Sequence, residues 1–321
     1  MNCLCCGKPI TSDNTSEISN GWHTKCIKKF FGTKEMPKIE ITNELLQEYA
    51  KDSTDKGYTV PGVQKKISLY LSKDSGQPPR LTLLNYPAGY ILKPQTDEYK
   101  SLPEAEYLAM HMAEEVGIKT VPYALIKLND ESIAYISKRI DRKETNNSIG
   151  IYAMEDFCQL AGRLTEDKYK GSYEKCAKII NDYSSQSRLD MTELFIRIIF
   201  SFVIGNSDMH FKNFSLIETD EGNCKYILSK AYDLLPVNTV NPSDTEQFAL
   251  TLNGKKRNLR KNDFLKFADS CGIDKKVAER LIEKVIKCKD NLINECKLSY
   301  LDDDMKTNLI NLIETRVAAL R

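Results

Sequence analysis

An α+β fold, in which a small strand-rich lobe precedes a larger helical lobe, is predicted by the order of the apolar segments. From residue 66 to residue 139 short alternating runs surround one segment of helical periodicity, in the order strand, strand, strand, helix, strand, strand. From residue 154 onward, apolar stripes recur at helical spacing. Cysteine and histidine residues near the N-terminus add a small metal-binding module. We therefore expect three parts, at residues 1–40, 41–140 and 141–321.

Composition and charge narrow the classes of function. The chain has 321 residues, and its 46 basic and 45 acidic side chains nearly balance, so the overall charge gives no reason to expect binding to nucleic acid or to a membrane surface. No apolar run approaches the roughly 18 residues of a membrane span, and the N-terminus lacks the apolar core of a signal peptide. We expect a cytoplasmic protein.

The metal-binding module is predicted from two pairs of ligands. Four of the ten cysteines lie within the first 26 residues, a distribution that suits a metal site and reduced thiols. Cys3 and Cys6 form one pair, and His23 and Cys26 form the second pair after sixteen intervening residues. Three thiolates and one imidazole favour a tetrahedral, structural Zn²⁺. Cys5 is an alternative ligand, and the spacing resembles that of a zinc ribbon or half of a LIM module.

The individual elements are predicted from periodicity and from helix start and stop signals. The helix at 103–117 has proline in its first turn and glycine at its end, and a short helix with Thr42 as its N-cap is expected at 43–51. The segment at 191–204 is apolar nearly all round, which predicts a buried helix. The expected strands lie at 67–71, 80–84, 89–93, 121–128 and 132–139. The other expected helices lie at 154–160, 274–297 and 302–320.

Side chains suited to catalysis gather in the stretch Gly205–Phe214, directly after the buried helix. Asp208 can act as a general base towards a hydroxyl group, Lys212 can neutralise a phosphate, and Asn213 can coordinate a hard cation. Asp233, twenty residues after Asn213, is a second carboxylate suited to Mg²⁺. One acid as base, with a second acid and an amide as metal ligands, is typical of a kinase catalytic loop. The alternative is a loop whose polar side chains merely face water.

Two features of the strand-rich region fit the same chemistry. Lys93 ends an apolar strand, and Glu106 lies beside the apolar stripe of the helix that follows. A strand lysine paired with a helix glutamate is how kinases hold the lysine on the phosphates of ATP. The turn containing Gly62 precedes the first strand, and backbone N–H groups in such a turn can contact phosphate oxygens. An ordinary hairpin has the same appearance in sequence.

From about Thr59 to its C-terminus the chain resembles the HipA family of bacterial serine/threonine kinases, which are toxins of toxin–antitoxin modules. The resemblance rests on several motifs in order, among them V-P-G-V-Q-K-K, Y-I-L-K-P, K-R-I-D-R, E-D-F-C-Q, G-N-S-D-M-H-F-K-N-F-S and A-Y-D-L-L-P. It implies a two-lobed kinase-like fold that binds Mg·ATP and phosphorylates protein hydroxyls. The known toxin targets in the family are aminoacyl-tRNA synthetases.

The resemblance also implies roles for individual residues. Lys93 would contact the ATP phosphates, and Asp141 would contact the ribose. Residues Lys138–Asp141, which include Arg139, would form the hinge next to the nucleotide. In the catalytic loop Asp208 would be the base and His210 would support the loop, with Lys212 beside them. The remaining implied site residues are Asn213 and Asp233 for Mg²⁺, the phosphate-covering loop Val60–Lys66 with Gly62, Val63, Gln64 and Lys65, and Thr59 at the position of autophosphorylation.

Partners and competing functions follow from where the chain departs from the family. The small N-terminal subdomain of longer members does not appear in the sequence, which suggests that a separate small protein supplies it; a DNA-binding antitoxin is a second expected partner. Two other classes of function compete with a protein kinase. One is a catalytically silent scaffold whose zinc module binds nucleic acid or a protein, and the other is a phosphotransferase acting on small molecules.

Overall fold

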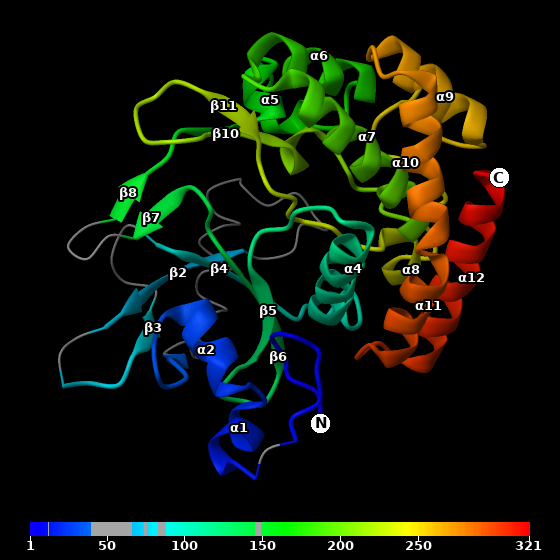
Figure 1. The fold of residues 1–321 in the computed structure, drawn as a ribbon. Coiled ribbons are helices and arrows are strands. Elements are labelled where there is room, and N and C mark those ends of the chain that lie inside the picture. The colour runs from blue at the N-terminus through cyan, green and yellow to red at the C-terminus, as the bar shows by residue number, and fades with distance from the viewer. Residues whose placement is uncertain (12, 40–65, 74–75, 83–87, 145–148) are drawn as a thin grey trace. The chain divides into compact units, whose positions relative to one another are not determined.

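The computed structural model describes residues 1–11, 13–39, 66–73, 76–82, 88–144 and 149–321 (Figure 1). These residues form two compact units. Unit 1 comprises Met1–Tyr107 and Val121–Arg139, and unit 2 comprises Leu108–Thr120 and Ile140–Arg321. The predicted helix at 43–51, Thr59 and the loop residues Gly62, Val63, Gln64 and Lys65 lie outside the described residues. The predicted boundaries near residues 40 and 140 stay predictions.

A six-stranded sheet forms the centre of unit 1. Its order is β1-β3-β2-β4-β6-β5, and every neighbouring pair is antiparallel except the parallel pair β1–β3. The predicted alternation holds in β2, where Ile67, Leu69 and Leu71 are buried. The strands are β1 Lys38–Ile39, β2 Ile67–Ser72, β3 Arg80–Thr82, β4 Tyr90–Pro94, β5 Tyr123–Lys127 and β6 Ile133–Lys138. The five predicted strands of this region are therefore confirmed, the second of them over its described residues 80–82.

The first residues of the chain pack against the edge of this sheet. Helices α1 (Thr15–Asn20) and α2 (Thr24–Phe31) follow a short N-terminal loop. The fully buried Trp22 donates its indole Nε1–H to the carbonyl oxygen of Leu125 at 3.0 Å, and the amide of Leu125 donates to the carbonyl oxygen of Leu4 at 2.8 Å. Both outward-facing backbone groups of Leu125 on edge strand β5 are thereby satisfied.

Helix α4 (Leu102–Val116) confirms the helix predicted between the third and fourth strands. The chain leaves it at Gly117, whose φ of 85° lies in the left-handed region that favours glycine. The predicted apolar stripe is buried: it consists of Ala105, Leu108, Ala109, Met112 and Val116.

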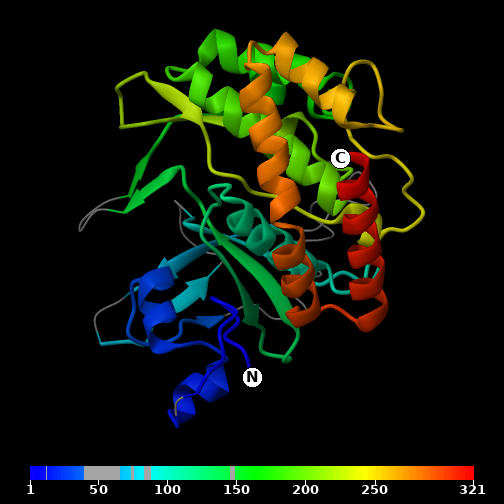
Figure 2. The same cartoon turned by 45° about the vertical axis from the view of Figure 1, so that its right-hand side comes forward.

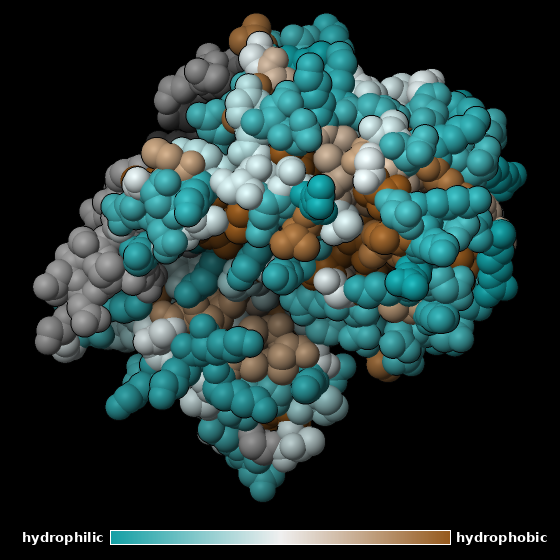
Figure 3. All heavy atoms as spheres, turned by 45° about the horizontal axis from the view of Figure 1, so that its top comes forward, coloured by the Kyte–Doolittle hydropathy of each residue, from teal (hydrophilic) through white to brown (hydrophobic). Residues whose placement is uncertain are grey.

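Unit 2 is built around helix α7 (Ser187–Ile204), whose last fourteen residues were predicted as a buried helix. It packs against α6 (Tyr173–Tyr183), α10 (Lys275–Lys287) and α12 (Asp303–Ala319), as Figures 1 and 2 show. A helix that is apolar nearly all round, as residues 191–204 are, is stable in water only when neighbours surround it. No helix among the described residues has the length and apolar character to cross a membrane. The face drawn in Figure 3 is mainly hydrophilic, with apolar side chains in smaller patches.

Short strands and helices complete unit 2. Strands β9, β10 and β11 form an antiparallel sheet in the order β11-β10-β9, and β7 pairs with β8. The strands are β7 Arg142–Glu144, β8 Ile149–Ile151, β9 Met154–Asp156, β10 Ser215–Glu218 and β11 Tyr226–Leu228. The helices are α5 Phe157–Leu160, α8 Val237–Val240, α9 Lys261–Ser270 and α11 Lys289–Leu298, and the 3₁₀ turns are Thr165–Asp167 and Phe211–Asn213.

Two predicted helices differ from the structure. The helix expected at 154–160 begins only at Phe157, because residues 154–156 pair with β10 as strand β9. The single helix expected at 274–297 is divided at Cys288 into α10 and α11. The two halves pack against different helices: α10 packs on α7 and α9, whereas α11 packs on α12. Tertiary packing, which periodicity does not report, decided both boundaries.

Candidate active site

The sequence-predicted catalytic loop leaves α7 through a turn that requires glycine. Gly205 has φ 70°, and a Cβ atom there would lie 2.4 Å from Cδ2 of Leu312. Directly after it, the side chain of Asn206 is 1% exposed, and its Oδ1 accepts a hydrogen bond from the amide of Asp208 at 3.3 Å. The turn and this bond fix the backbone from which Asp208 projects.

Asp208 combines an exposed carboxylate with a fixed orientation. Its side chain is 48% exposed. The hydroxyl of Tyr169 donates a hydrogen bond to Oδ1 at 2.6 Å, and Nε2 of His210 lies 4.0 Å from Oδ2. A carboxylate that is open to solvent and held at one oxygen has the geometry that a general base requires.

His210 is a buried and neutral neighbour of this carboxylate. Burial is the largest influence on its imidazole and lowers the pKa of His210 to about 4, although the negative charge of Asp208 acts in the opposite direction. The ring packs edge to face on Tyr169 with centroids 5.0 Å apart. At neutral pH the side chain therefore supplies packing to the loop and no positive charge.

Asn213 and Asp233 provide oxygen atoms suited to a hard cation. The side chain of Asn213 is buried, and its Nδ2 donates to the backbone carbonyl of Asp233 at 3.2 Å. Its Oδ1 has no hydrogen-bond partner among the described residues. Asp233 has φ 55°, a left-handed conformation that is uncommon outside glycine. A buried amide oxygen without a partner, on a side chain that contacts the backbone of an aspartate, fits Mg²⁺, which prefers oxygen ligands.

Lys212 is fastened to a carboxylate in unit 2. Its Nζ donates to Oδ2 of Asp156 at 2.8 Å, and Asp156 also caps α5 by accepting a hydrogen bond from the amide of Gln159. The charge of Lys212 is thus already matched by Asp156, so a phosphate would have to compete for it. This contact ties the predicted catalytic loop to the start of α5.

Tyr169 and Asp156 were not predicted as site residues. Tyr169 lies 39 residues before Asp208 in sequence, within a polar stretch that gives no sign of its contact. Asp156 did have a signal in the sequence, because Asp156 and Gln159 have the spacing of a helix capping box. That signal predicts a helix start and not a contact with Lys212.

In unit 1, the predicted lysine–glutamate pair forms. Nζ of Lys93 lies 2.5 Å from Oε1 of Glu106, and the two residues are 4% and 2% exposed. The ammonium group also lies over the ring of Tyr135, 5.3 Å from its centroid.

The predicted hinge residues Arg139 and Asp141 lie where the chain leaves the six-stranded sheet. The amide of Arg139 donates to the carbonyl oxygen of Gly89, and Asp141, in unit 2, accepts a hydrogen bond from Arg142 at 2.7 Å.

The four predicted metal ligands converge in unit 1. The ligand atoms of Cys3, Cys6, His23 and Cys26 all lie within 4.8 Å of one another. Nδ1 of His23 is 3.4 Å from Sγ of Cys6 and 3.9 Å from Sγ of Cys26. Metal–ligand bonds of about 2.0–2.3 Å in a tetrahedron imply separations of roughly 3.5 Å between ligands, so this donor set fits Zn²⁺. The converging group does not include the alternative ligand Cys5.

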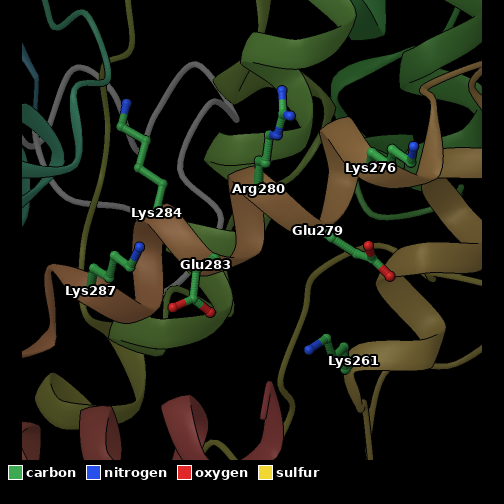
Figure 4. A pocket seen from close by; sticks show the side chains of 7 residues that line it. All are labelled: Lys261, Lys276, Glu279, Arg280, Glu283, Lys284 and Lys287. Atoms are coloured by element: carbon green, nitrogen blue, oxygen red, sulfur yellow. The ribbon is translucent and has the colours of Figure 1, made fainter.

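A basic hollow of about 690 Å³ lies on α9 and α10, apart from the predicted site residues (Figure 4). Five cations and two carboxylates line it: Lys261, Lys276, Glu279, Arg280, Glu283, Lys284 and Lys287.

Comparisons with known proteins define first the class of fold and then the family. A solved complex of HipA, HipB and operator DNA from the Shewanella oneidensis toxin–antitoxin system has a TM-score of 0.67 to this chain. It is 16% identical, and the match covers 84% of this chain and 70% of the HipA chain. The Helicobacter pylori proinflammatory kinase CtkA has a TM-score of 0.53 at 16% identity, covering 74% of this chain and 89% of CtkA. The chain thus has the HipA-like α+β fold.

The sequence match shows the family. The HipA-like C-terminal domain matches residues 58–292, and the protein belongs to this family. A relative from Haemophilus influenzae named "Putative kinase" is 23% identical over 294 residues, which is 84% of each chain. A second, "Putative kinase Y4dM" from Sinorhizobium fredii, is 28% identical over 235 residues; the match covers 68% of this chain and 55% of that relative. The predicted family and fold class are confirmed.

Proposed function

We propose that this protein is a Mg·ATP-dependent kinase that transfers the γ-phosphate to a hydroxyl group of a protein. The observation that carries the proposal is the loop of unit 2, in which a half-exposed, oriented Asp208 lies five residues before Asn213. The buried Oδ1 of Asn213 has no partner among the described residues, and Nδ2 of the same side chain donates to the backbone carbonyl of Asp233. Base and metal ligands in this order suit phosphoryl transfer, and the names of the relatives support the same chemistry.

Each residue has a defined task in this proposal. Asp208 accepts the proton of the attacking hydroxyl, while His210 packs behind it as a neutral ring. Asn213 and Asp233 hold Mg²⁺, which supplies charge neutralisation when it is bound. Lys93, oriented by Glu106, contacts the phosphates. The remaining nucleotide contacts are assigned to Asp141 for the ribose, Arg139 at the hinge, Lys212 beside the phosphate, and the loop residues Gly62, Val63, Gln64 and Lys65.

Labelled ATP distinguishes this proposal from its competitors. The purified parent protein is incubated with γ-labelled ATP, Mg²⁺ and a cytoplasmic lysate. Two control reactions are run in parallel, one with EDTA added and one with the Asp233→Asn variant in place of the parent. A kinase labels lysate proteins, and both EDTA and Asp233→Asn reduce the label. A small-molecule phosphotransferase labels only compounds of low mass. A silent scaffold labels nothing, and that result would exclude the proposal.

Substrate and partners are finer parts of the proposal. We propose serine or threonine hydroxyls as acceptors, an aminoacyl-tRNA synthetase as the candidate protein, and the cytoplasm as the location. The solved HipA structure contains HipB and operator DNA, which supports a DNA-binding antitoxin as partner. A separate small protein that supplies an N-terminal subdomain is the second proposed partner.

Thr59 is the proposed site of autophosphorylation. A phosphate adds nearly two negative charges and would draw the loop that follows Thr59 away from the nucleotide, which lowers activity. Mass spectrometry of the protein expressed with active Asp208 is expected to find phosphate on Thr59, and none in the Asp208→Ala variant. Phosphate found only on other residues, such as Ser53 or Ser68, would contradict the assignment to Thr59 and leave the kinase proposal intact.

We propose one structural Zn²⁺ at the four converging ligands. Metal analysis of freshly purified protein is expected to find about one zinc per chain, and Cys26→Ser is expected to lower that content. Because Trp22 and Leu4 bond to Leu125 on β5, loss of the metal should also lower the unfolding temperature of the unit 1 sheet.

Two cysteine variants serve as controls for the zinc prediction. Cys224→Ser removes an exposed thiol in unit 2 and should leave the zinc content unchanged. Cys5→Ser tests the alternative ligand and should also leave it unchanged. The metal site would be refuted if the parent protein contained no zinc after purification and unfolded at the same temperature as the Cys26→Ser variant.

A further inference from the structure

The proton-accepting oxygen of the proposed base already binds a hydroxyl group. Oη of Tyr169 lies 2.6 Å from Oδ1 of Asp208 and donates its hydrogen to it. This is the distance and the bond that an acceptor hydroxyl makes with a general base just before it loses its proton. No other side-chain hydroxyl among the described residues is hydrogen-bonded to Asp208.

The segment that presents Tyr169 is attached to the catalytic loop on both sides. Before Tyr169, the guanidinium of Arg163 lies over the ring of Phe211, 5.3 Å from its centroid. After it, the hydroxyl of Tyr173 donates to the carbonyl oxygen of Met209 at 3.0 Å. The position of Tyr169 is therefore set by the same loop that positions Asp208.

Tyr169 itself is held less firmly than its flanks. The residue is 43% exposed. Among the described residues, its side chain contacts Asp208, the ring of His210 and the ammonium group of Lys168, which lies 4.9 Å from the ring centroid. Contact with Asp208 and burial raise the pKa of the Tyr169 hydroxyl, with burial the larger cause, so it keeps its proton at neutral pH. An exposed, protonated side chain on a fixed segment can turn away without unfolding its surroundings.

We propose that Tyr169 Oη stands in for the acceptor hydroxyl, and that the acceptor must displace it to reach Asp208. The inference rests on the proposed kinase function and identifies the residue at which the acceptor enters. A serine or threonine hydroxyl of a polypeptide takes the place of Tyr169 Oη on Oδ1 of Asp208. The hydroxyl proton passes to Asp208 as its oxygen bonds to the γ-phosphorus, the bond from that phosphorus to the bridging oxygen breaks, and ADP leaves.

The consequence is that Tyr169 suppresses transfer to water while no acceptor is bound. Water is the smallest acceptor, and it reaches Oδ1 only when the tyrosine hydroxyl has left. Displacing a hydrogen bond to a charged group costs roughly a factor of ten or more in an equilibrium. Tyr169→Phe removes the hydroxyl and keeps the ring that packs on His210.

The test measures Mg·ATP hydrolysis by the full chain without any protein acceptor. Tyr169→Phe is expected to hydrolyse ATP about tenfold faster than the parent. Tyr183→Phe, which removes the hydroxyl of an exposed tyrosine on α6 in the same unit, is the matched control and should match the parent rate. Thermal unfolding of all three proteins checks that the fold is retained.

The other outcomes distinguish a failure of this inference from a failure of the proposed kinase function. Unchanged or slower hydrolysis in Tyr169→Phe would show that Tyr169 only orients Asp208 and would overturn the inference alone. Phosphate on Tyr169 after incubation with Mg·ATP would also overturn it, because the residue would then be an acceptor itself. No turnover in parent or variant, with either water or lysate proteins as acceptor, would remove the kinase proposal together with the inference.

Discussion

Asp208→Asn is expected to slow phosphoryl transfer by about 10²–10⁴-fold, the contribution typical of a positioned general base. The amide keeps the shape of the carboxylate and can still accept the hydrogen bond that Tyr169 donates at 2.6 Å, but it cannot take up the acceptor proton. Because Asp208 is not a proposed metal ligand, Mg·ATP should bind the variant as well as it binds the parent. Transfer of labelled phosphate and calorimetric titration with Mg·ATP measure the two properties separately.

The matched control changes a carboxylate that has no role in the proposed site. Asp182 is exposed on α6 of the same unit, so Asp182→Asn makes the same chemical change and should leave the transfer rate within about twofold, as is usual for exposed substitutions. Transfer by Asp208→Asn at the parent rate would show that another residue is the base.

Glu106→Gln is expected to destabilise unit 1 by about 3–5 kcal/mol, because it removes the negative charge that the carboxylate holds against the buried ammonium group of Lys93. Both side chains are at most 5% exposed, and the two charged atoms are 2.5 Å apart. A loss of this size is a large share of the roughly 5–15 kcal/mol that stabilises a typical domain. Denaturant unfolding measures it, and phosphoryl transfer should fall as well if Lys93 contacts the phosphates.

An exposed pair in the same unit provides the comparison. Nζ of Lys127 lies 3.0 Å from Glu131, but the two side chains are 36% and 79% exposed. Glu131→Gln should therefore change the free energy of unfolding by less than about 1 kcal/mol. Equal effects of the two substitutions would contradict the assignment of the Lys93–Glu106 pair as a buried ion pair.

Features encoded over a few residues were predicted well from the sequence. The alternation in β2 and the stripe of α4 follow from the periods of strand and helix, since burial of one face imposes each pattern. The convergence of the four proposed metal ligands was predictable because Cys3–Cys6 and His23–Cys26 are each close in sequence, so that each pair lies on a single turn or at the start of a helix. The order Asp208, Asn213, Asp233 also indicated a base and two metal ligands, and this assignment stays a prediction.

Contacts between distant segments were decided by the tertiary structure. Tyr169 meets Asp208 across 39 residues, Asp156 meets Lys212 across 56, and Trp22 meets Leu125 across 103. None has a periodic signature, because the folded chain and not the covalent spacing brings these partners together. The division of the predicted 274–297 helix at Cys288 has the same origin, since its two halves pack on different helices.

The sequence by itself determined the family and the fold class, and it identified the four cysteine and histidine side chains that converge near the N-terminus. Each is read from residue types at short spacing, where chain geometry leaves few alternatives. Only the tertiary structure decided that a tyrosine hydroxyl binds the predicted base, that Asp156 pairs with Lys212, and that the N-terminal module completes the edge of a sheet. These contacts depend on which surfaces pack together, and packing is a property of the whole fold.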